Sequence, residues 1–326
     1  MYAFRALMET HQTAIYFTAV VLAALVGRLI PDSTTLDMAI NPALAFMLFV
    51  TFLQVPMTTL GKSFTQWRFL AALLSVNFIA IPLFIWILLP YLPDNPMIRF
   101  GMLLVLLAPC IDYVVTFSQI GQADAPRLLA ATPVLLMVQM LALPLYLGLF
   151  LSQEAAASVQ FTPFLHAFIW LIAAPLLLAA AIQWGSSRQQ SIRRLAAGLS
   201  FFPVPATALV LFVVVASVIP QLQNAWHSVL SVLPFYLLFA IVAPILGWMA
   251  GRFFRLDSAS GRAVAFSAGT RNSLIVLPIA LAMPGATSLL PVIIVSQTLI
   301  ELLSELVYIR IIPRLNAHSS QAGVSH

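Results

Sequence analysis

Apolar runs of about 20 residues recur along the whole chain, and this pattern constrains the fold more than any other feature of the sequence. Each run is long enough to cross a hydrocarbon core of about 30 Å as an α-helix. Of the 326 residues, 62% are hydrophobic and only 8% are charged, which is too little charge for the surface of a water-soluble protein of this length. The sequence therefore predicts an all-α polytopic membrane protein without a soluble domain.

The apolar runs predict ten transmembrane helices joined by short connections. Turn-forming residues fill these connections, as in "PDSTTLD" and "YLPDNP". We count the first run as a retained helix and not as a signal peptide, because no small-x-small cleavage site follows it. The predicted spans cover residues 13–30, 41–60, 69–90, 98–119, 128–152, 162–184, 201–220, 229–250, 261–283 and 287–311.

The basic residues fall almost entirely on one side of this topology. Only Arg28 and Arg99 lie on the other side, and Arg271 falls within the ninth span. Because Lys and Arg concentrate in cytoplasmic loops, the bias predicts a multi-pass protein of the cell (inner) membrane with both termini in the cytoplasm. No basic block stands beside an aromatic platform, so we expect no nucleic-acid partner. Twelve basic residues lie on the predicted cytoplasmic side: Arg5, Lys62, Arg68, Arg127, Arg188, Arg193, Arg194, Arg252, Arg255, Arg262, Arg310 and Arg314.

Two pairs of spans resemble each other at nearly equal spacing, which indicates an internal duplication. The second and seventh spans contain "PALAFMLFV" and "PATALVLFV", with six of nine positions identical. The fifth and tenth spans contain "PVLLMVQ" and "PVIIVSQ". We therefore expect two five-helix repeats, residues 1–156 and 157–326. Because five is odd, the second repeat enters the membrane from the opposite side, and such inverted repeats are typical of secondary transporters with alternating access.

The duplication pairs the fourth span with the ninth, and each of them is interrupted. The fourth contains "APCID", where Pro109 removes a backbone hydrogen bond and clashes with the preceding turn. The ninth contains "SAGTRNS", where Gly269 and small polar residues weaken the helix. Corresponding interruptions in two halves of a transporter indicate a midplane binding site, so we expect helices 4 and 9 to be broken and to cross there.

Four ionisable residues fall deep within predicted spans: Asp112, Arg271, Glu301 and Glu305. Intramembrane charges cost at least about 2.5–3.5 kcal/mol on insertion scales and usually face a cavity or a partner. Asp112 and Arg271 lie in the two interruptions, either as a charge switch that couples transport to protons or as a static salt bridge. Glu301 is either a proton carrier or a protonated helix–helix contact. Glu305 lies one turn later, nearer the cytoplasmic end, and we favour the structural role for it.

Uncharged polar residues accompany these charges. Cys110, the only cysteine of the chain, is either a transient ligand for a soft ion or a passive small hydrophobe. A single thiol cannot enclose a metal ion, so we expect neither a metal site nor a cofactor. Asn272 and Ser273 lie in the ninth-span interruption and are candidate substrate-binding residues. Interhelical hydrogen bonding explains the remaining polar residues as well as ligand contact does: Thr270, Gln139 and Gln297.

Ten spans, a five-plus-five inversion and interrupted spans 4 and 9 together resemble the bile acid/sodium symporter superfamily over essentially the whole chain. The ninth span, "GTRNSLIVLPIALAMPG", is similar to the ninth helix of the sodium-coupled branch, where a Gly-x-Gln-Asn-Ser run follows a glutamate of the sodium site. Asn272 and Ser273 match this pattern. Arg271 stands at the glutamine position and Ser267 at the glutamate position. The resemblance therefore implies a protein cation in place of a bound Na⁺.

The fourth span, "LLAPCIDYVVTF", is similar to the fourth helix of arsenite-efflux permeases, which carries a functional cysteine in an Arg-Cys-Ile-Ala-type run. Cys110 and Ile111 match this run, whereas Pro109 and Asp112 do not. The tenth helix of these permeases carries a functional glutamate, and Glu301 in "TLIELLSEL" matches it by position, without the proline that follows there. This resemblance implies Cys110 as a substrate ligand and Glu301 as a proton carrier.

These residues support two transport hypotheses. The first is a proton-coupled efflux permease of the arsenite type, with Asp112 and Arg271 as the coupling pair. The second is a sodium- or proton-coupled carrier of a small organic anion whose carboxylate pairs with Arg271. An intramembrane enzyme fits poorly, because the sequence holds no Asp-rich prenyl-phosphate motif, no His-Glu-x-x-His and no Gly-x-Ser-x-Gly. We therefore expect a secondary transporter whose partners are the lipid bilayer and a small-molecule or oxyanion substrate.

Overall fold

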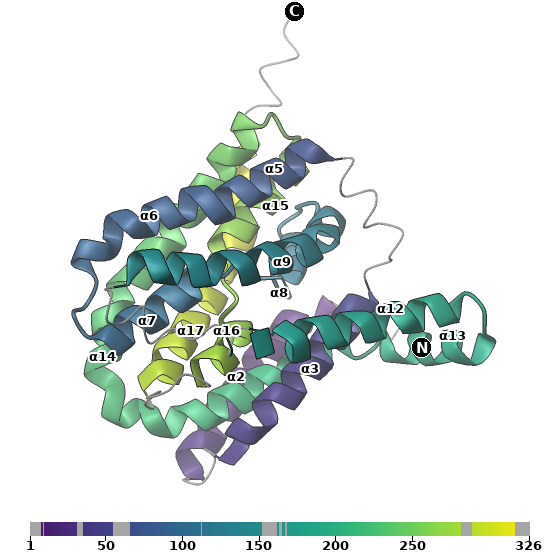
Figure 1. Cartoon of the computed structure of the whole chain (residues 1–326), viewed down its shortest axis with the longest axis horizontal. Helices are drawn as coiled ribbons and strands as arrows, with labels where there is room; N and C mark the ends of the chain where they lie inside the picture. Colours follow the sequence, from purple (N-terminus) through teal and green to yellow (C-terminus); the bar gives the residue numbers. More distant parts are fainter. Residues whose placement is uncertain are drawn as a thin grey trace, which may run out of the picture. The chain divides into compact units, whose positions relative to one another are not determined.

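The computed structural model describes most of the chain as helix (Figure 1). Within the described residues there is no β-strand, and the bridge between Pro109 and Arg271 is isolated. The all-helical prediction is thus confirmed for this part of the chain. The described residues are 8, 10–30, 35–54, 66–111, 113–151, 162, 165–166, 168–281 and 289–316.

The chain divides into two compact units, each assembled from segments that lie far apart in the sequence. The predicted repeats 1–156 and 157–326 each contribute to both units, and the repeat boundary itself stays a prediction. The first unit takes in Met1–Thr58, Gln160–His227 and Leu274–Val295, and the second takes in Thr59–Val159, Ser228–Ser273 and Ser296–His326.

The first unit is held together by close helix contacts. Its α12 packs against α3 and against α13. The Gln183 side-chain amide donates to the carbonyl oxygens of Phe52 and Leu53 at the end of α3, at 3.2 Å each. Gly27 lets α2 approach α14, since a Cβ there would lie 2.7 Å from the Ala216 carbonyl oxygen. The helices of this unit are α2 (Gln12–Leu29), α3 (Asp37–Leu53), the π-helical turn Phe168–Ala173, α12 (Ala174–Ser186), α13 (Gln190–Leu199) and the first part of α14 (Pro203–Phe253).

The second unit is built around α15 (Ser258–Gly269), which packs against α5, α8 and α9. Its sequence, "SASGRAVAFSAG", is rich in small residues, so neighbouring backbones can come close. A Cβ at Gly247 of α14 would lie 2.7 Å from the Ala265 Cα. The other helices are α5 (Trp67–Ser75), the π-helical turn Val76–Ala80, α6 (Ile81–Leu88), α7 (Pro96–Leu106), α8 (Tyr113–Ile120), α9 (Ala125–Phe150), the last part of α14 and α17 (Leu289–Ile311) from Ser296 onward.

Every predicted span contains helix, and seven helices of the described residues are long and apolar enough to cross a membrane. The remaining predicted spans correspond to α3, whose predicted range runs into residues outside the described part, and to the two interrupted spans. These helices are those of a multi-pass membrane protein. The seven are Gln12–Leu29, Trp67–Tyr91, Ala125–Phe150, Ile169–Ser186, Pro203–Leu222, Ala225–Phe253 and Leu289–Leu315.

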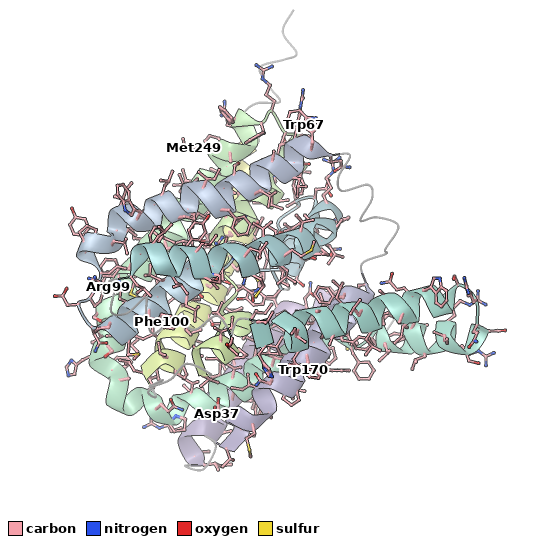
Figure 2. The ribbon with its side chains drawn as sticks, viewed as in Figure 1. Asp37, Trp67, Arg99, Phe100, Trp170 and Met249 are labelled. Atoms are coloured by element: carbon pink, nitrogen blue, oxygen red, sulfur yellow. The ribbon has the colours of Figure 1, made fainter. Side chains whose placement is uncertain are left out.

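Large apolar side chains cover parts of the surface, as lipid contact requires. On α9, Leu141, Leu145 and Leu149 follow one another at intervals of one turn, and all three are exposed. Trp67 at the start of α5 and Trp170 are also exposed (Figure 2). A water-soluble protein would rarely present such a continuous apolar stripe.

The connection predicted between the seventh and eighth spans is helical instead. The helix α14 continues without a break from Pro203 to Phe253. The intervening residues 221–228 contain neither glycine nor proline, so no residue there ends the helix. The polar composition of residues 221–228 predicted a loop, but these residues form helix.

Candidate functional site

Both predicted interruptions are present in the second unit, and they cross each other. The helix α7 ends at Leu106 before α8 begins, and α15 ends at Gly269 before α16 (Ser273–Leu281) begins. Between them, the Cys110 N–H donates to the Thr270 carbonyl at 3.1 Å. The Asn272 N–H donates to the Ala108 carbonyl at 2.7 Å. The two extended segments thus satisfy each other's backbone groups, which is what non-helical backbone at membrane depth requires.

The guanidinium of Arg271 lies fully buried at the crossing and contacts the ends of two helices. Its Nη2 donates to the carbonyls of Ser267 at 2.8 Å and Ala268 at 2.7 Å, in the last turn of α15. Its Nη1 donates over 3.4 Å to the carbonyl of Leu106, the last residue of α7. Carbonyls at helix C-termini lack intrahelical donors and carry the negative end of the helix dipole. The sequence therefore places a fixed cation where two broken helices present negative charge.

Asn77 completes this cation's surroundings. Its Oδ1 accepts from Arg271 Nη2 at 2.8 Å, and its Nδ2 donates to the Ser267 hydroxyl and the Leu73 carbonyl at 3.0 Å. The ring of Phe239 lies 5.3 Å from the guanidinium carbon. Asn77 belongs to the π-helical turn Val76–Ala80, a feature frequent at functional sites. The sequence analysis missed Asn77, although it is the one amide in an otherwise apolar third span.

Glu301 of α17 contacts the main chain of Arg271 and not its guanidinium. The Arg271 N–H donates to Glu301 Oε2 at 2.7 Å, and the Gln297 amide donates to the same oxygen at 2.5 Å. The hydroxyl of Tyr113, at the start of α8, donates to Oε1 at 2.6 Å. Three donors thus surround a carboxylate that is 2% exposed. Tyr113 was also missed by the sequence analysis, since no motif distinguishes it from the other aromatic residues.

The structure brings most of the predicted site residues together. Cys110, Asn272 and Ser273 are buried within the crossing, and the Ser273 hydroxyl accepts from Thr298 at 2.7 Å. Gln139 of α9 is fully buried, and neither atom of its amide has a hydrogen-bond partner among the described residues. Asp112 lies outside the described residues, and so does its predicted pairing with Arg271. No group of three His, Cys, Asp or Glu side chains in the described part of the chain could hold a metal ion.

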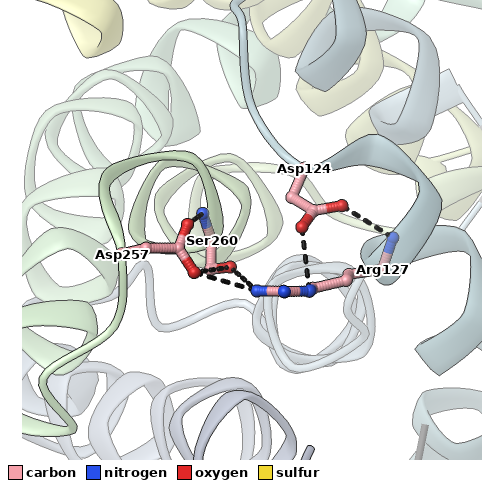
Figure 3. A network of polar contacts seen from close by, with 4 residues as sticks. All are labelled: Asp124, Arg127, Asp257 and Ser260. Atoms are coloured by element: carbon pink, nitrogen blue, oxygen red, sulfur yellow. Dashed lines mark hydrogen bonds and ion pairs between the residues drawn. The ribbon is translucent and has the colours of Figure 1, made fainter. Parts of the chain in front are cut away.

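A second polar network joins the starts of α9 and α15 (Figure 3). Asp124 and Asp257 each cap a helix by accepting from a backbone N–H, of Arg127 at 3.1 Å and of Ser260 at 2.9 Å. The Arg127 guanidinium lies 2.9 Å from both carboxylates and also contacts the Ser260 hydroxyl. Partial burial opposes ionisation of Asp257, but the donors from Ser260 and Arg127 lower its pKa below the ordinary value. This network fixes the start of α15, the buried helix whose other end leads into the crossing.

A model of the Sodium Bile acid symporter family matches residues 41–224, more than half of the chain. The chain belongs to the Sodium Bile acid symporter family. This assignment confirms the resemblance at the level of the superfamily and makes the chain a membrane transporter. The matched range includes Cys110 and ends before Arg271 and Glu301. No curated protein matches the chain in sequence.

Proposed function

We propose that this member of the Sodium Bile acid symporter family is a proton-coupled efflux permease of the arsenite type that works without sodium. The observation that carries this proposal is the position of the Arg271 guanidinium, on the carbonyls that end α7 and α15. Carbonyl and amide oxygens are the ligands that hard cations take, and here the protein's own cation occupies them. A sodium ion at the same place would meet a fixed positive charge.

Proton coupling in this proposal rests on the buried carboxylate of Glu301. Its oxygens accept from Tyr113, Gln297 and the Arg271 N–H, so the site stabilises a negative charge inside the unit. One of these donors is the main chain of the crossing itself. Glu301 therefore supplies a buried negative charge to the segment 270–272, whose Thr270 carbonyl accepts from the Cys110 N–H. The role of Asp112 as partner of Arg271 stays a prediction.

A neutral, thiophilic substrate suits the crossing better than an organic anion does. As(OH)₃ is uncharged near neutral pH, and a single thiol can bind it without trapping it. An anion would need the guanidinium of Arg271, but both of its Nη atoms already donate to protein oxygens. The organic-anion hypothesis is therefore the less well supported of the two.

The proposed transport cycle uses ten membrane spans in two inverted repeats. The grouping of helices into units supports this arrangement. The first unit draws on predicted spans 1, 2, 6 and 7, and the second draws on spans 3–5 and 8–10, apart from residues 274–295. Each unit thus takes repeat-related spans from both halves, as alternating access by related elements requires.

Transport into inverted membrane vesicles tests the substrate. We expect accumulation of arsenite under an imposed proton gradient and none of small carboxylates. Cys110→Ser, which replaces the thiol by a hydroxyl of similar shape without its affinity for arsenic, should abolish arsenite accumulation, whereas Ser118→Ala on α8 serves as the matched control. Accumulation of carboxylates in place of arsenite, or equal arsenite transport by wild type and Cys110→Ser, would overturn the assignment.

A further inference from the structure

Glu305 is the second buried carboxyl group of α17, and its hydrogen bonding differs from that of Glu301. Its side chain is fully buried, one helical turn beyond Glu301 on the same face. Its Oε1 lies 2.5 Å from the Thr270 hydroxyl oxygen. Its Oε2 is buried and has no hydrogen-bond partner in the described part of the chain. An ionised carboxylate left in this way would carry an uncompensated buried charge.

The hydrogen count at Thr270 assigns a proton to Glu305. The Thr270 hydroxyl oxygen also lies 2.7 Å from the carbonyl oxygen of Phe266. A hydroxyl has one hydrogen and a carbonyl only accepts, so the hydrogen of Thr270 is needed for Phe266. The contact between Thr270 and Glu305 is then a hydrogen bond only if the carboxyl group donates. With an ionised Glu305, one of the two short contacts would bring lone pairs together without a hydrogen between them.

Neighbouring charges favour the same assignment. Among the described residues, Glu301 accepts from three donors, whereas Glu305 contacts only the Thr270 hydroxyl. Two carboxylates one turn apart in a buried environment repel each other, so one of the pair retains a proton. Apart from Glu301 and Thr270, Glu305 interacts with Tyr308 of its own helix, whose hydroxyl donates to the Ala240 carbonyl of α14. The guanidinium of Arg271 donates to the carbonyls of the helix ends and makes no hydrogen bond to either carboxyl group of α17 within the described residues.

Thr270 connects this proton to the crossing. Its hydroxyl contacts Glu305, and its carbonyl accepts from the Cys110 N–H at 3.1 Å. If Glu305 releases its proton to water, the O–H bond of the acid breaks and the proton leaves as hydronium. The Thr270 hydroxyl must then turn from Phe266 to the new carboxylate. The last turn of α15 thereby loses a hydrogen bond beside the backbone that holds Cys110.

We propose that Glu305, protonated and donating to Thr270, carries the proton that the transporter moves, with the Thr270 hydroxyl transmitting its protonation state to the crossing. The proposal rests on the proposed proton-coupled function, and it moves the role of proton carrier from Glu301 to Glu305, a residue for which the sequence alone favoured a structural role. Glu301 remains ionised in the described state and provides the fixed negative charge that keeps the proton on Glu305.

Infrared difference spectroscopy on the purified protein tests the protonation without any substrate. We expect wild type at neutral pH to show the carbonyl band of a protonated carboxylic acid, and Glu305→Gln to lose it. Asp94→Asn, the same acid-to-amide change at an exposed site, should keep the band. Glu301→Gln, which removes the neighbouring negative charge, should weaken it. Absence of the band in wild type, or its persistence in Glu305→Gln, overturns the proposal.

Transport in proteoliposomes tests the role of that proton, with arsenite as the probe. Glu305→Gln should reduce arsenite accumulation driven by a pH gradient by roughly 100-fold, while exchange of arsenite at equal pH persists. Gradient-driven accumulation equal to that of wild type would overturn the proposal. If wild type itself does not move arsenite, the proposed function fails, and the infrared band still decides whether Glu305 holds a proton.

Discussion

The side chain of Arg271 donates to the carbonyls that end two broken helices. A guanidinium presents five N–H donors in a planar fork, so it can reach several carbonyls at once, which an ammonium group cannot do. Here the fork reaches Asn77, the last turn of α15 and the end of α7. The guanidinium therefore stabilises the crossing through its hydrogen bonds as well as through its charge.

Substitution of Arg271 should destabilise the protein in a graded way. Arg271→Gln removes the charge and leaves buried acceptors unpaired, which should lower the free energy of unfolding by about 3–5 kcal/mol. Arg271→Lys keeps the charge but not the fork, and a loss of about 1–3 kcal/mol is expected. Thermal or denaturant unfolding of the detergent-solubilised protein measures both. Equal stability of wild type and Arg271→Gln would contradict the described contacts.

Asn77 offers a second test at the same scale. Asn77→Ala removes one acceptor from Arg271 and one donor from Ser267, and should cost about 1–3 kcal/mol of folding free energy. Ser75→Ala, two residues earlier, removes only a local bond to the Ala72 carbonyl and should change stability by less than about 0.5 kcal/mol. The same unfolding measurement compares them. If Ser75→Ala lowered the free energy of unfolding as much as Asn77→Ala, the hydrogen bonds of Asn77 to the site would not contribute to stability.

The site was partly predictable from the sequence at this scale. Cys110, Arg271 and Glu301 stood out because charges and a thiol are costly or rare in apolar spans. Asn77 and Tyr113 did not, because their importance depends on side chains about 190 positions away, Ser267 and Glu301. The partners of the Arg271 guanidinium include backbone carbonyls, which leave no trace in residue types.

Among the elements, the broken helices were the most predictable and the long helix the least. Pro109 and Gly269 are local causes of the two breaks, so the sequence sufficed to locate them. The crossing between them depends on hydrogen bonds between distant segments, which only the structure provides. The continuous α14 shows the reverse case, since polar composition predicted a loop where no residue ends the helix.

Close packing of α14 on α15 predicts opposite effects for two helical glycines. A Cβ at Gly247 would lie 2.7 Å from both the Ala265 Cα and the Ala268 Cβ, whereas a Cβ at Gly148 of α9 meets nothing within 4 Å. Gly247→Ala should therefore destabilise the protein by about 1–3 kcal/mol. Gly148→Ala should stabilise it by about 0.4–1 kcal/mol, through lower entropy of the unfolded chain. Unfolding midpoints that rank the two variants in the opposite order would contradict this packing.

The network at the starts of α9 and α15 predicts a loss of stability in acid. The pKa of Asp257 is lowered in the folded protein, so its contribution is present above the ordinary aspartate range and is lost as pH falls through the lowered pKa, below about pH 4. The contribution should stay under about 1 kcal/mol, because the carboxylate is 58% exposed. Stability measured against pH should show this acid slope in wild type. Asp257→Asn should flatten it, and an unchanged slope in that variant would exclude Asp257 as its source.

At the scale of the whole molecule, the family assignment and the apolar helices establish a multi-pass membrane transporter. The ten-span count, the inverted repeats and the cytoplasmic termini stay predictions. They rest on the distribution of basic residues and on short repeats, and neither of these locates the bilayer. Residue counting alone also could not show that each unit would combine spans from both halves of the chain.

The proposed function depends most on one point, that the Arg271 guanidinium takes the place of a bound sodium ion. Transport of arsenite into vesicles, measured with Na⁺ and again with Na⁺ replaced by choline at a fixed proton gradient, tests it most directly. The position of the Arg271 guanidinium predicts equal initial rates in the two media. A strict requirement for sodium would contradict the account.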